Sequence, residues 1–181
     1  MPSGRHTLPP RRRSAATTSS WPRLPAHRRG MMSLMAAFDV HLDTDLPAAE
    51  AWRRVLDLRA HAEVIPLTTV TGEQLEAAAL EQGSRFVART SLGPVGFDDI
   101  MVVDSIEQPT DGSGGRARIH KEGKVIRGTI DFRVTPLGST STVDWAQQIS
   151  VRWVPRAADP LVARVARTAY GKALAQLLRR G

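Results

Sequence analysis

Two consecutive carboxylates in a strand-like segment are the residues whose type and spacing first suggest chemistry. Asp98 and Asp99 are neighbours, and because successive side chains of a β-strand point to opposite faces of a sheet, one of them must face inward. Burial favours the neutral form of a carboxyl group, which would suit the inward aspartate to general acid or base catalysis. A salt bridge to Arg89, at the surface or the sheet edge, would instead keep it ionised. Asp99 is the candidate catalytic carboxylate.

The last predicted strand carries one polar residue on an otherwise apolar face. That face consists of Val143, Trp145, Gln147, Ile149, Val151 and Trp153. A buried amide must find hydrogen-bond partners, so Gln147 is a candidate for orienting the carbonyl group of a ligand. A structural hydrogen bond and simple exposure are the alternatives. The strand before it offers a matching face, in which Gly128 would leave space: Ile126, Ile130, Phe132 and Val134.

The remaining polar candidates are isolated from one another. Tyr170, the one tyrosine, lies near the middle of the last predicted helix, where its hydroxyl could reach a cavity and act as a second catalytic candidate. Core packing with the hydroxyl at the surface is the alternative. His120 and Lys121 are adjacent in a strand, so Lys121 faces inward if Ile119 does. His41 is expected to be exposed. Because no two histidines have metal-ligand spacing and cysteine is absent, we expect no metal site, and we expect no cofactor.

The elements that must position these residues follow a recognisable order. A period of two predicts a strand over residues 37–44, and Asp45 and Pro47 suit the cap and first turn of a helix that reaches residue 58. A second short helix over 59–65 is ended by Pro66. Residues 74–82 are ambiguous between helix and strand plus connector. Strands joined by glycine-containing turns are predicted over 67–73, 84–92, 95–107, 116–122, 125–136 and 140–154, and a helix over 159–180.

This order predicts an α+β protein. The last helix shows an apolar stripe of Leu161, Val165, Ala169, Ala173 and Leu177. A curved antiparallel sheet of about seven strands, with two short helices after the first strand and the long C-terminal helix across its concave face, would bury all of these apolar faces together.

Charge and composition exclude several classes of protein. The net charge is +7, but residues 1–30 contain seven arginines and no acidic residue, so the other 18 basic residues balance all 18 acidic ones. The charge of the body therefore gives no reason to expect a nucleic-acid partner. The hydrophobic fraction of 41% is that of a globular domain. No apolar run approaches the ~20 residues needed to span a bilayer.

The first 34 residues are predicted to be a disordered, Arg- and Pro-rich extension of the domain that spans residues 35–181. A secretory or twin-arginine signal lacks its apolar region here, and the prolines oppose the amphipathic helix of an organellar transit peptide. A translation start at Met31, Met32 or Met35 is the third interpretation. We expect a cytoplasmic protein.

Several sequence blocks, in this order, resemble the SRPBCC superfamily of START-like, or Bet v 1-like, helix-grip proteins. They are the helix at 47–58 with Trp52, GSRFVART at 83–90, GPVGFDD at 93–99, VIRGTIDFRVTPLG at 125–138 and STVDW at 141–145. Within that superfamily the chain looks similar to bacterial polyketide cyclase/dehydrase and lipid transport proteins. The resemblance covers residues 36–180 and implies the helix-grip fold.

The resemblance also implies a cavity between the sheet and the C-terminal helix that binds a hydrophobic small molecule such as a lipid or polyketide. On the predicted faces, the ligand-binding candidates are Phe132, Trp145, Gln147, Ile149, Trp153, Val165 and Tyr170. A polyketide aromatase/cyclase that folds a reactive chain is the first alternative, and an interaction or regulatory module with a vestigial cavity is the second. The resemblance does not fix the ligand, catalysis or the oligomeric state.

Overall fold

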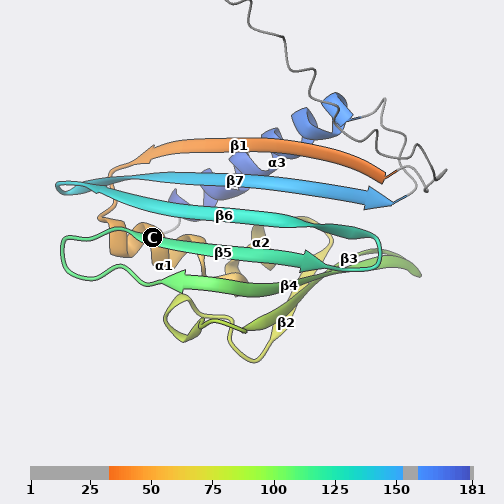
Figure 1. Cartoon of the computed structure of the whole chain (residues 1–181), viewed down its shortest axis with the longest axis horizontal. Coiled ribbons are helices and arrows are strands. Elements are labelled where there is room, and N and C mark those ends of the chain that lie inside the picture. Colours follow the sequence, from red (N-terminus) through yellow and green to blue (C-terminus); the bar gives the residue numbers. More distant parts are fainter. Residues whose placement is uncertain (1–32, 153–158, 180–181) are drawn as a thin grey trace, which may run out of the picture.

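The computed structural model describes residues 33–152 and 159–179, and these form one curved antiparallel sheet with three α-helices (Figure 1). The strands are β1 (Ser33–Thr44), β2 (Thr68–Gly72), β3 (Arg85–Leu92), β4 (Val95–Glu107), β5 (Gly115–Glu122), β6 (Ile126–Leu137) and β7 (Thr140–Arg152). Their order in the sheet is β1-β7-β6-β5-β4-β3-β2. Strands β2 to β7 therefore form a meander, and β1 closes the far edge by pairing with β7.

Two short helices and one long helix lie against the same face of this sheet (Figure 1). They are α1 (Ala48–Val55), α2 (Leu58–Val64) and α3 (Asp159–Arg179). The predicted α+β helix-grip architecture is thus confirmed, including the two short helices after the first strand. The ambiguous segment 74–82 contains a single 3₁₀ turn, Ala77–Ala79, rather than a further strand or an α-helix.

The start of α1 differs in detail from the prediction. Pro47 occupies the N-cap and Asp45 does not cap the helix; Thr44 Oγ1 instead accepts a hydrogen bond from the backbone N–H of Leu46. In α2, by contrast, the Asp57 side chain accepts from two backbone N–H groups of the first turn and fixes the helix start.

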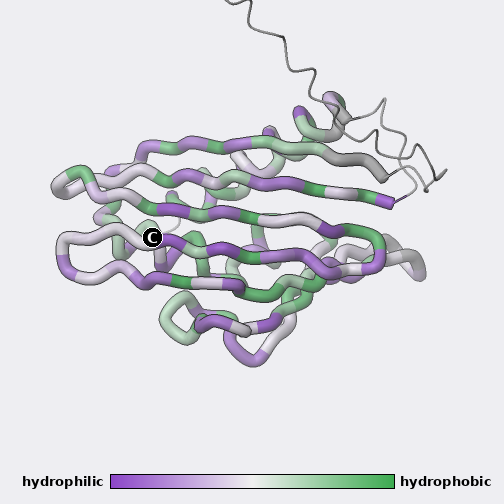
Figure 2. Tube along the Cα trace, in the orientation of Figure 1, coloured by the Kyte–Doolittle hydropathy of each residue, from purple (hydrophilic) through white to green (hydrophobic). Residues whose placement is uncertain are grey.

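The strand faces follow the predicted alternation. In β5, Ala117, Ile119 and Lys121 are buried while their neighbours are not. In β7, Val143, Trp145 and Gln147 face the core, as predicted. Figure 2 shows the consequence, with hydrophilic and hydrophobic residues alternating along the central strands.

Gly128 has a different role from the predicted one. It adopts a φ of +153°, and a Cβ atom there would lie 1.9 Å from the carbonyl oxygen of Gln148. The space that the missing side chain leaves is therefore taken by the backbone of β7, and not by the interior of the sheet. Only glycine fits this close approach of β6 and β7.

The apolar face of α3 is rotated relative to the predicted stripe. Leu161 and Val165 are 66% and 60% exposed. The residues that pack inward come later in the helix: Ala166, Tyr170, Ala173, Leu174, Leu177 and Leu178. The reason is geometric, because residues spaced by four drift about 40° around a helix of 3.6 residues per turn with each step. A stripe of five such residues cannot stay on one face.

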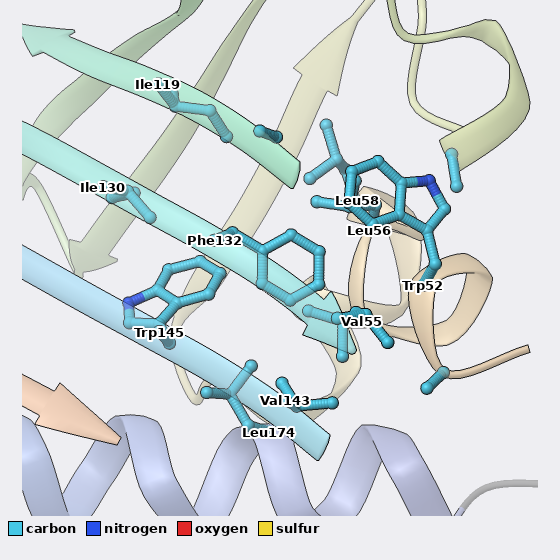
Figure 3. Close-up of a cluster of buried hydrophobic side chains, with 14 of the residues drawn as sticks. Trp52, Val55, Leu56, Leu58, Ile119, Ile130, Phe132, Val143, Trp145 and Leu174 are labelled. Carbon is cyan, nitrogen blue, oxygen red and sulfur yellow. The ribbon is translucent and has the colours of Figure 1, made fainter. Parts of the chain in front are cut away.

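Aromatic side chains connect the helices to the sheet. Phe132 stacks on Trp52 with ring centroids 5.1 Å apart and lies 5.9 Å from Trp145 on the other side (Figure 3). Trp145 in turn stacks on Tyr170 of α3 at 5.9 Å. The core is therefore continuous from α1 through β6 and β7 to α3.

Candidate functional site: a cavity with a buried ion pair

A cavity of about 150 Å³ remains between the sheet and the helices α2 and α3. Most of its walls are apolar, with Val70, Phe86, Ile119 and Ile130 contributed by four different strands. The polar side chains at its wall are His61, Thr68, Thr90, Asp99, Lys121 and Tyr170. Thr68 and Thr90 hydrogen-bond to each other at 2.9 Å, so their hydroxyls are largely accounted for.

Asp99 and Lys121 form a buried ion pair in the wall of this cavity. Lys121 Nζ donates a hydrogen bond to Asp99 Oδ2, and the two side chains are 1% and 12% exposed for Lys121 and Asp99. The ammonium group also lies 3.6 Å from Met101 Sδ. The second carboxylate oxygen, Asp99 Oδ1, is buried and has no hydrogen-bond partner among the described residues. Such an atom is unusual, because nearly all buried polar groups are satisfied.

The surroundings keep Lys121 charged. Burial opposes the charge, but Tyr170 and Asp99 outweigh that effect and raise the pKa of the Lys121 ammonium above its ordinary value. Lys121 is therefore protonated at neutral pH and is not available as a free amine. Its partner in the ion pair is the Asp99 carboxylate.

The adjacent aspartate has a different environment. Asp98 points to the outer face of the sheet and forms a salt bridge with Arg89, with Nη1 and Oδ1 2.9 Å apart. Arg89 thus pairs with Asp98 and not with the inward Asp99. The inward carboxylate is held instead by Lys121, which lies on the neighbouring strand β5.

His61 adds a neutral imidazole to the wall. Its Nε2 lies 2.7 Å from the carbonyl oxygen of Val55, and since a carbonyl can only accept, Nε2 carries the proton. Burial lowers the pKa of His61; the hydrogen bond to Val55 and the charge of Asp57 oppose this effect, and the Lys121 charge adds a small further lowering. His61 is therefore neutral at pH 7, and its Nδ1 retains a lone pair.

Gln147 is fixed beside the cavity. It is 2% exposed, and its Oε1 accepts a hydrogen bond of 2.9 Å from Trp145 Nε1. Its Nε2 is buried and finds no partner among the described residues. Trp145 lines the cavity, but Gln147 does not line it directly. The amide oxygen thus makes a structural hydrogen bond, one of the two alternatives to ligand binding, while the amide nitrogen keeps a donor that the described residues do not use.

The other predicted residues lie in the cavity wall, in the core or at the surface, and one lies outside the described residues. Tyr170 lines the cavity and packs on Phe38 with ring centroids 5.4 Å apart. Phe132 is absorbed into the core against Trp52 (Figure 3), and Ile149 packs on the edge of that core. Val165 faces outward, as described above. Trp153 lies outside the described residues.

A second hollow adjoins the first. It has a volume of about 130 Å³ and is lined by Val64, Ile65, Pro66, Ala169, Tyr170 and Ala173. Ile65 and Tyr170 line both spaces. These two side chains therefore stand between the cavity and the hollow at the contact of α2 with α3.

Two polar residues of the site were not chosen from the sequence. Lys121 could have been found by the alternation of Ala117, Ile119 and Lys121, which places the lysine inward whenever the isoleucine is inward. His61 gave no such signal, because it lies on a helix of only seven residues whose orientation depends on the packing of α2.

The described part of the chain has neither a cluster of metal ligands nor a membrane-spanning helix. Residues 33–152 and 159–179 contain no group of three or more His, Cys, Asp or Glu side chains that could hold a metal ion. Among the same residues, no helix combines the length and hydropathy needed to cross a membrane.

Comparison with solved structures identifies the fold of the chain. No protein-family model matches the chain, and a search of curated proteins finds no significant match. Solved structures do match: the Zhui aromatase/cyclase from Streptomyces sp. R1128 superimposes with a TM-score of 0.58 at 13% identity, over 80% of this chain and 92% of that one. A START superfamily protein from Mycobacterium smegmatis gives 0.55 at 14%, over 78% and 93%.

A third match is a STAR-related lipid transfer protein from Xanthomonas axonopodis, with a TM-score of 0.57 at 15% identity, over 77% of this chain and 84% of that one. Each match covers more than three quarters of this chain, at an identity of 13–15% that shows the fold alone. The chain has the SRPBCC, or START-like, helix-grip fold, as its sequence blocks indicated.

Proposed function

We propose that this protein binds a hydrophobic small molecule, such as a lipid or a polyketide, in the cavity between the sheet and α3, and that it does so in the cytoplasm. The observation that carries the proposal is the cavity itself, a space of about 150 Å³ with mostly apolar walls. Trp145 lines the cavity without filling it, and Phe132 packs against Trp52. An unfilled apolar space costs stability, so its presence favours a ligand.

The size of the space limits how such a ligand can sit. Pockets for drug-sized molecules usually measure about 300–1,000 Å³, so a whole lipid or polyketide exceeds this cavity. Such a ligand would place one end in the cavity and extend past Ile65 and Tyr170 into the adjoining hollow of about 130 Å³. The matches to a lipid transfer protein and an aromatase/cyclase support this class of ligand.

Native mass spectrometry of the protein purified from its host tests the proposal directly. We expect a co-purified mass that is released on denaturation, together with thermal stabilisation by members of lipid and polyphenol libraries. The variant Ala88→Leu fills the cavity from β3 and should abolish both effects. Val87→Leu, on the opposite face of the same strand, is the matched control. Retention of the ligand by Ala88→Leu, or an empty spectrum with no thermal shift, would contradict the proposal.

A polyketide aromatase/cyclase activity is the second candidate. The observation that favours it is the charged Lys121 in a desolvated wall beside Tyr170, since such a cation can stabilise the enolate oxygen formed when a poly-β-ketone cyclises. Asp99 and the Tyr170 hydroxyl are then the groups that could exchange protons with the substrate. Incubation with a linear poly-β-ketone should give an aromatic product with the wild type and much less with Tyr170→Phe; equal yields would exclude this role for Tyr170.

A further inference from the structure

The helix α2 covers the cavity with a small buried face. Leu58 and His61 of α2, and Ile65 at its C-terminal end, line the cavity. Of the seven described residues of α2, Leu58 alone is buried, whereas α1 buries four of its eight residues. A helix this short has little stability of its own in water, so α2 depends on its packing. Such an element can open locally while the rest of the domain stays folded.

The two ends of α2 are held differently. At the N-terminal end, Asp57 caps the helix and the backbone N–H of Leu58 donates a hydrogen bond of 2.9 Å to the carbonyl oxygen of Leu75. At the C-terminal end, Ile65 stands between the cavity and the adjoining hollow of about 130 Å³. The C-terminal end therefore borders open space on two sides and is the end that can move.

Leu67 joins this end of α2 to β2 in a strained conformation. Its φ is +61°, and it is the one non-glycine residue among those described that has a positive φ. The left-handed region is unfavourable for leucine, because the Cβ atom comes too close to a backbone carbonyl oxygen. A residue keeps such a conformation only where the surrounding structure imposes it, and such residues are frequent in switch regions.

The conformation of Leu67 is imposed by the backbone on its two sides. On the side of β2, the carbonyl oxygen of Leu67 accepts a hydrogen bond of 3.0 Å from the N–H of Ser91, and Thr68 pairs with Thr90 of β3. On the side of α2, the ring of Pro66 fixes its own φ, so the change of direction falls on Leu67. The Leu67 side chain is 59% exposed and gains little packing in return. Its φ can therefore relax once the end of α2 moves away.

We infer that the C-terminal end of α2 is a gate to the cavity, which opens away from α3 as the backbone of Leu67 relaxes from its left-handed conformation. The closed gate is the strained state, and relief of that strain offsets part of the cost of opening. The N-terminal end of α2 stays attached at Asp57 and Leu58. The gate rests on the proposed binding function, since it provides the route of the ligand, but its opening is measurable without a ligand.

An introduced thiol reports the opening, because the chain contains no cysteine. Ala88→Cys places a thiol in the cavity wall on β3, and its reaction with 4,4′-dithiodipyridine is followed by absorbance. The rate is compared for Ala88→Cys alone and for Ala88→Cys combined with Leu67→Asn. Asparagine tolerates the left-handed conformation, so it removes strain from the closed gate and makes opening rarer. We expect Leu67→Asn to slow the labelling about fivefold.

The matched control is Leu137→Asn. Leu137, in β6, is 57% exposed, close to the 59% of Leu67, but its φ is not positive. The same substitution there should leave the labelling rate unchanged. Equal labelling rates with Leu67→Asn and Leu137→Asn would overturn the role of Leu67.

Two other results would overturn the gate itself. A thiol at position 88 that reacts as fast as a free thiol would mean that the cavity is permanently open. A thiol that reacts only at the rate of global unfolding, measured in parallel by circular dichroism, would mean that α2 does not open locally. Both results leave the proposed binding function standing, because the co-purified ligand and Ala88→Leu test it separately.

Hydrogen exchange covers the case in which Ala88→Cys does not fold. Followed by mass spectrometry in the wild type, the amides of residues 61–67 should exchange at least about tenfold faster than those of α1, relative to their intrinsic rates. Leu67→Asn should slow the exchange of that segment and leave α1 unchanged. Equal exchange of the segment in the wild type and in Leu67→Asn would contradict the inference.

Discussion

Removal of one member of the buried ion pair should destabilise the fold far more than removal of both. In Lys121→Met, the apolar side chain fills the space of the lysine stem, but the carboxylate of Asp99 is left without its counter-charge in a desolvated wall. Loss of one partner of a buried pair costs about 3–5 kcal/mol. Because the Asp99 side chain keeps 12% exposure, some water can reach it, and we expect a loss near the lower end, about 3 kcal/mol.

The assay is urea unfolding followed by far-ultraviolet circular dichroism. For a domain of this length, about 3 kcal/mol corresponds to a fall of roughly 6–12 °C in the melting temperature, which differential scanning calorimetry resolves. The double variant Asp99→Val/Lys121→Met should recover most of the loss, since an apolar pair of similar volume pays no desolvation cost.

The adjacent surface pair is the matched control. Arg89 and Asp98 lie on neighbouring strands of the same sheet, but their side chains are 55% and 46% exposed. Arg89→Met should therefore cost at most about 1 kcal/mol. The reasoning is refuted if Lys121→Met costs no more than Arg89→Met, or if the double variant is less stable than Lys121→Met.

Four further predictions concern the neighbouring elements. Burial lowers the pKa of His61, so the free energy of unfolding should fall below pH 6.5, by at most about 1.4 kcal/mol per pH unit. Urea unfolding at pH 5 and pH 7 should show a smaller fall for His61→Gln than for the wild type. Gly128→Ala should cost at least about 2 kcal/mol, measured by thermal unfolding, because its Cβ would collide with β7; a neutral effect would mean that the strands separate freely. In the same assay, Leu174→Ala should cost about 2–5 kcal/mol and Val165→Ser under about 0.5 kcal/mol. A larger cost for Val165→Ser would mean that α3 packs through the stripe predicted from the sequence. Ile65→Ala should speed release of a bound probe in stopped-flow experiments by opening the contact between cavity and hollow; an unchanged rate would place the access route elsewhere.

Much of the fold was predictable because it follows from local patterns. Alternating side chains identified the strands, glycine-containing turns separated them, and the apolar faces of β6 and β7 could be matched before their pairing was known. The end of α2 followed from Pro66, whose effect is local, but its start at Asp57 fell inside the helix that was predicted to reach residue 58. The prediction of the buried face of α3 was wrong for Leu161 and Val165, because residues spaced by four rotate progressively around the helix.

The site was predictable only in part. That one of Asp98 and Asp99 faces inward followed from the strand geometry, and Tyr170 and Trp145 do line the cavity. Phe132 is aromatic and lies on the concave face of the sheet, as expected for a cavity residue, but it stacks on Trp52 instead. Whether a side chain on the concave face meets a ligand or a helix depends on where α1 and α3 pack, and no local pattern contains that information.

The sequence by itself determined the order of elements, the alternation of faces and the balanced charge of the region after residue 30, because each depends on residues close together in the chain. The tertiary structure alone decided that Lys121 pairs with Asp99, since the two residues lie 22 positions apart on different strands. It also decided that Asp99 Oδ1 finds no hydrogen-bond partner among the described residues, because the partners of a buried oxygen are known only once the surrounding side chains are placed. The type of each residue determines which interactions it can make, and the packing of distant segments determines which residues line the cavity.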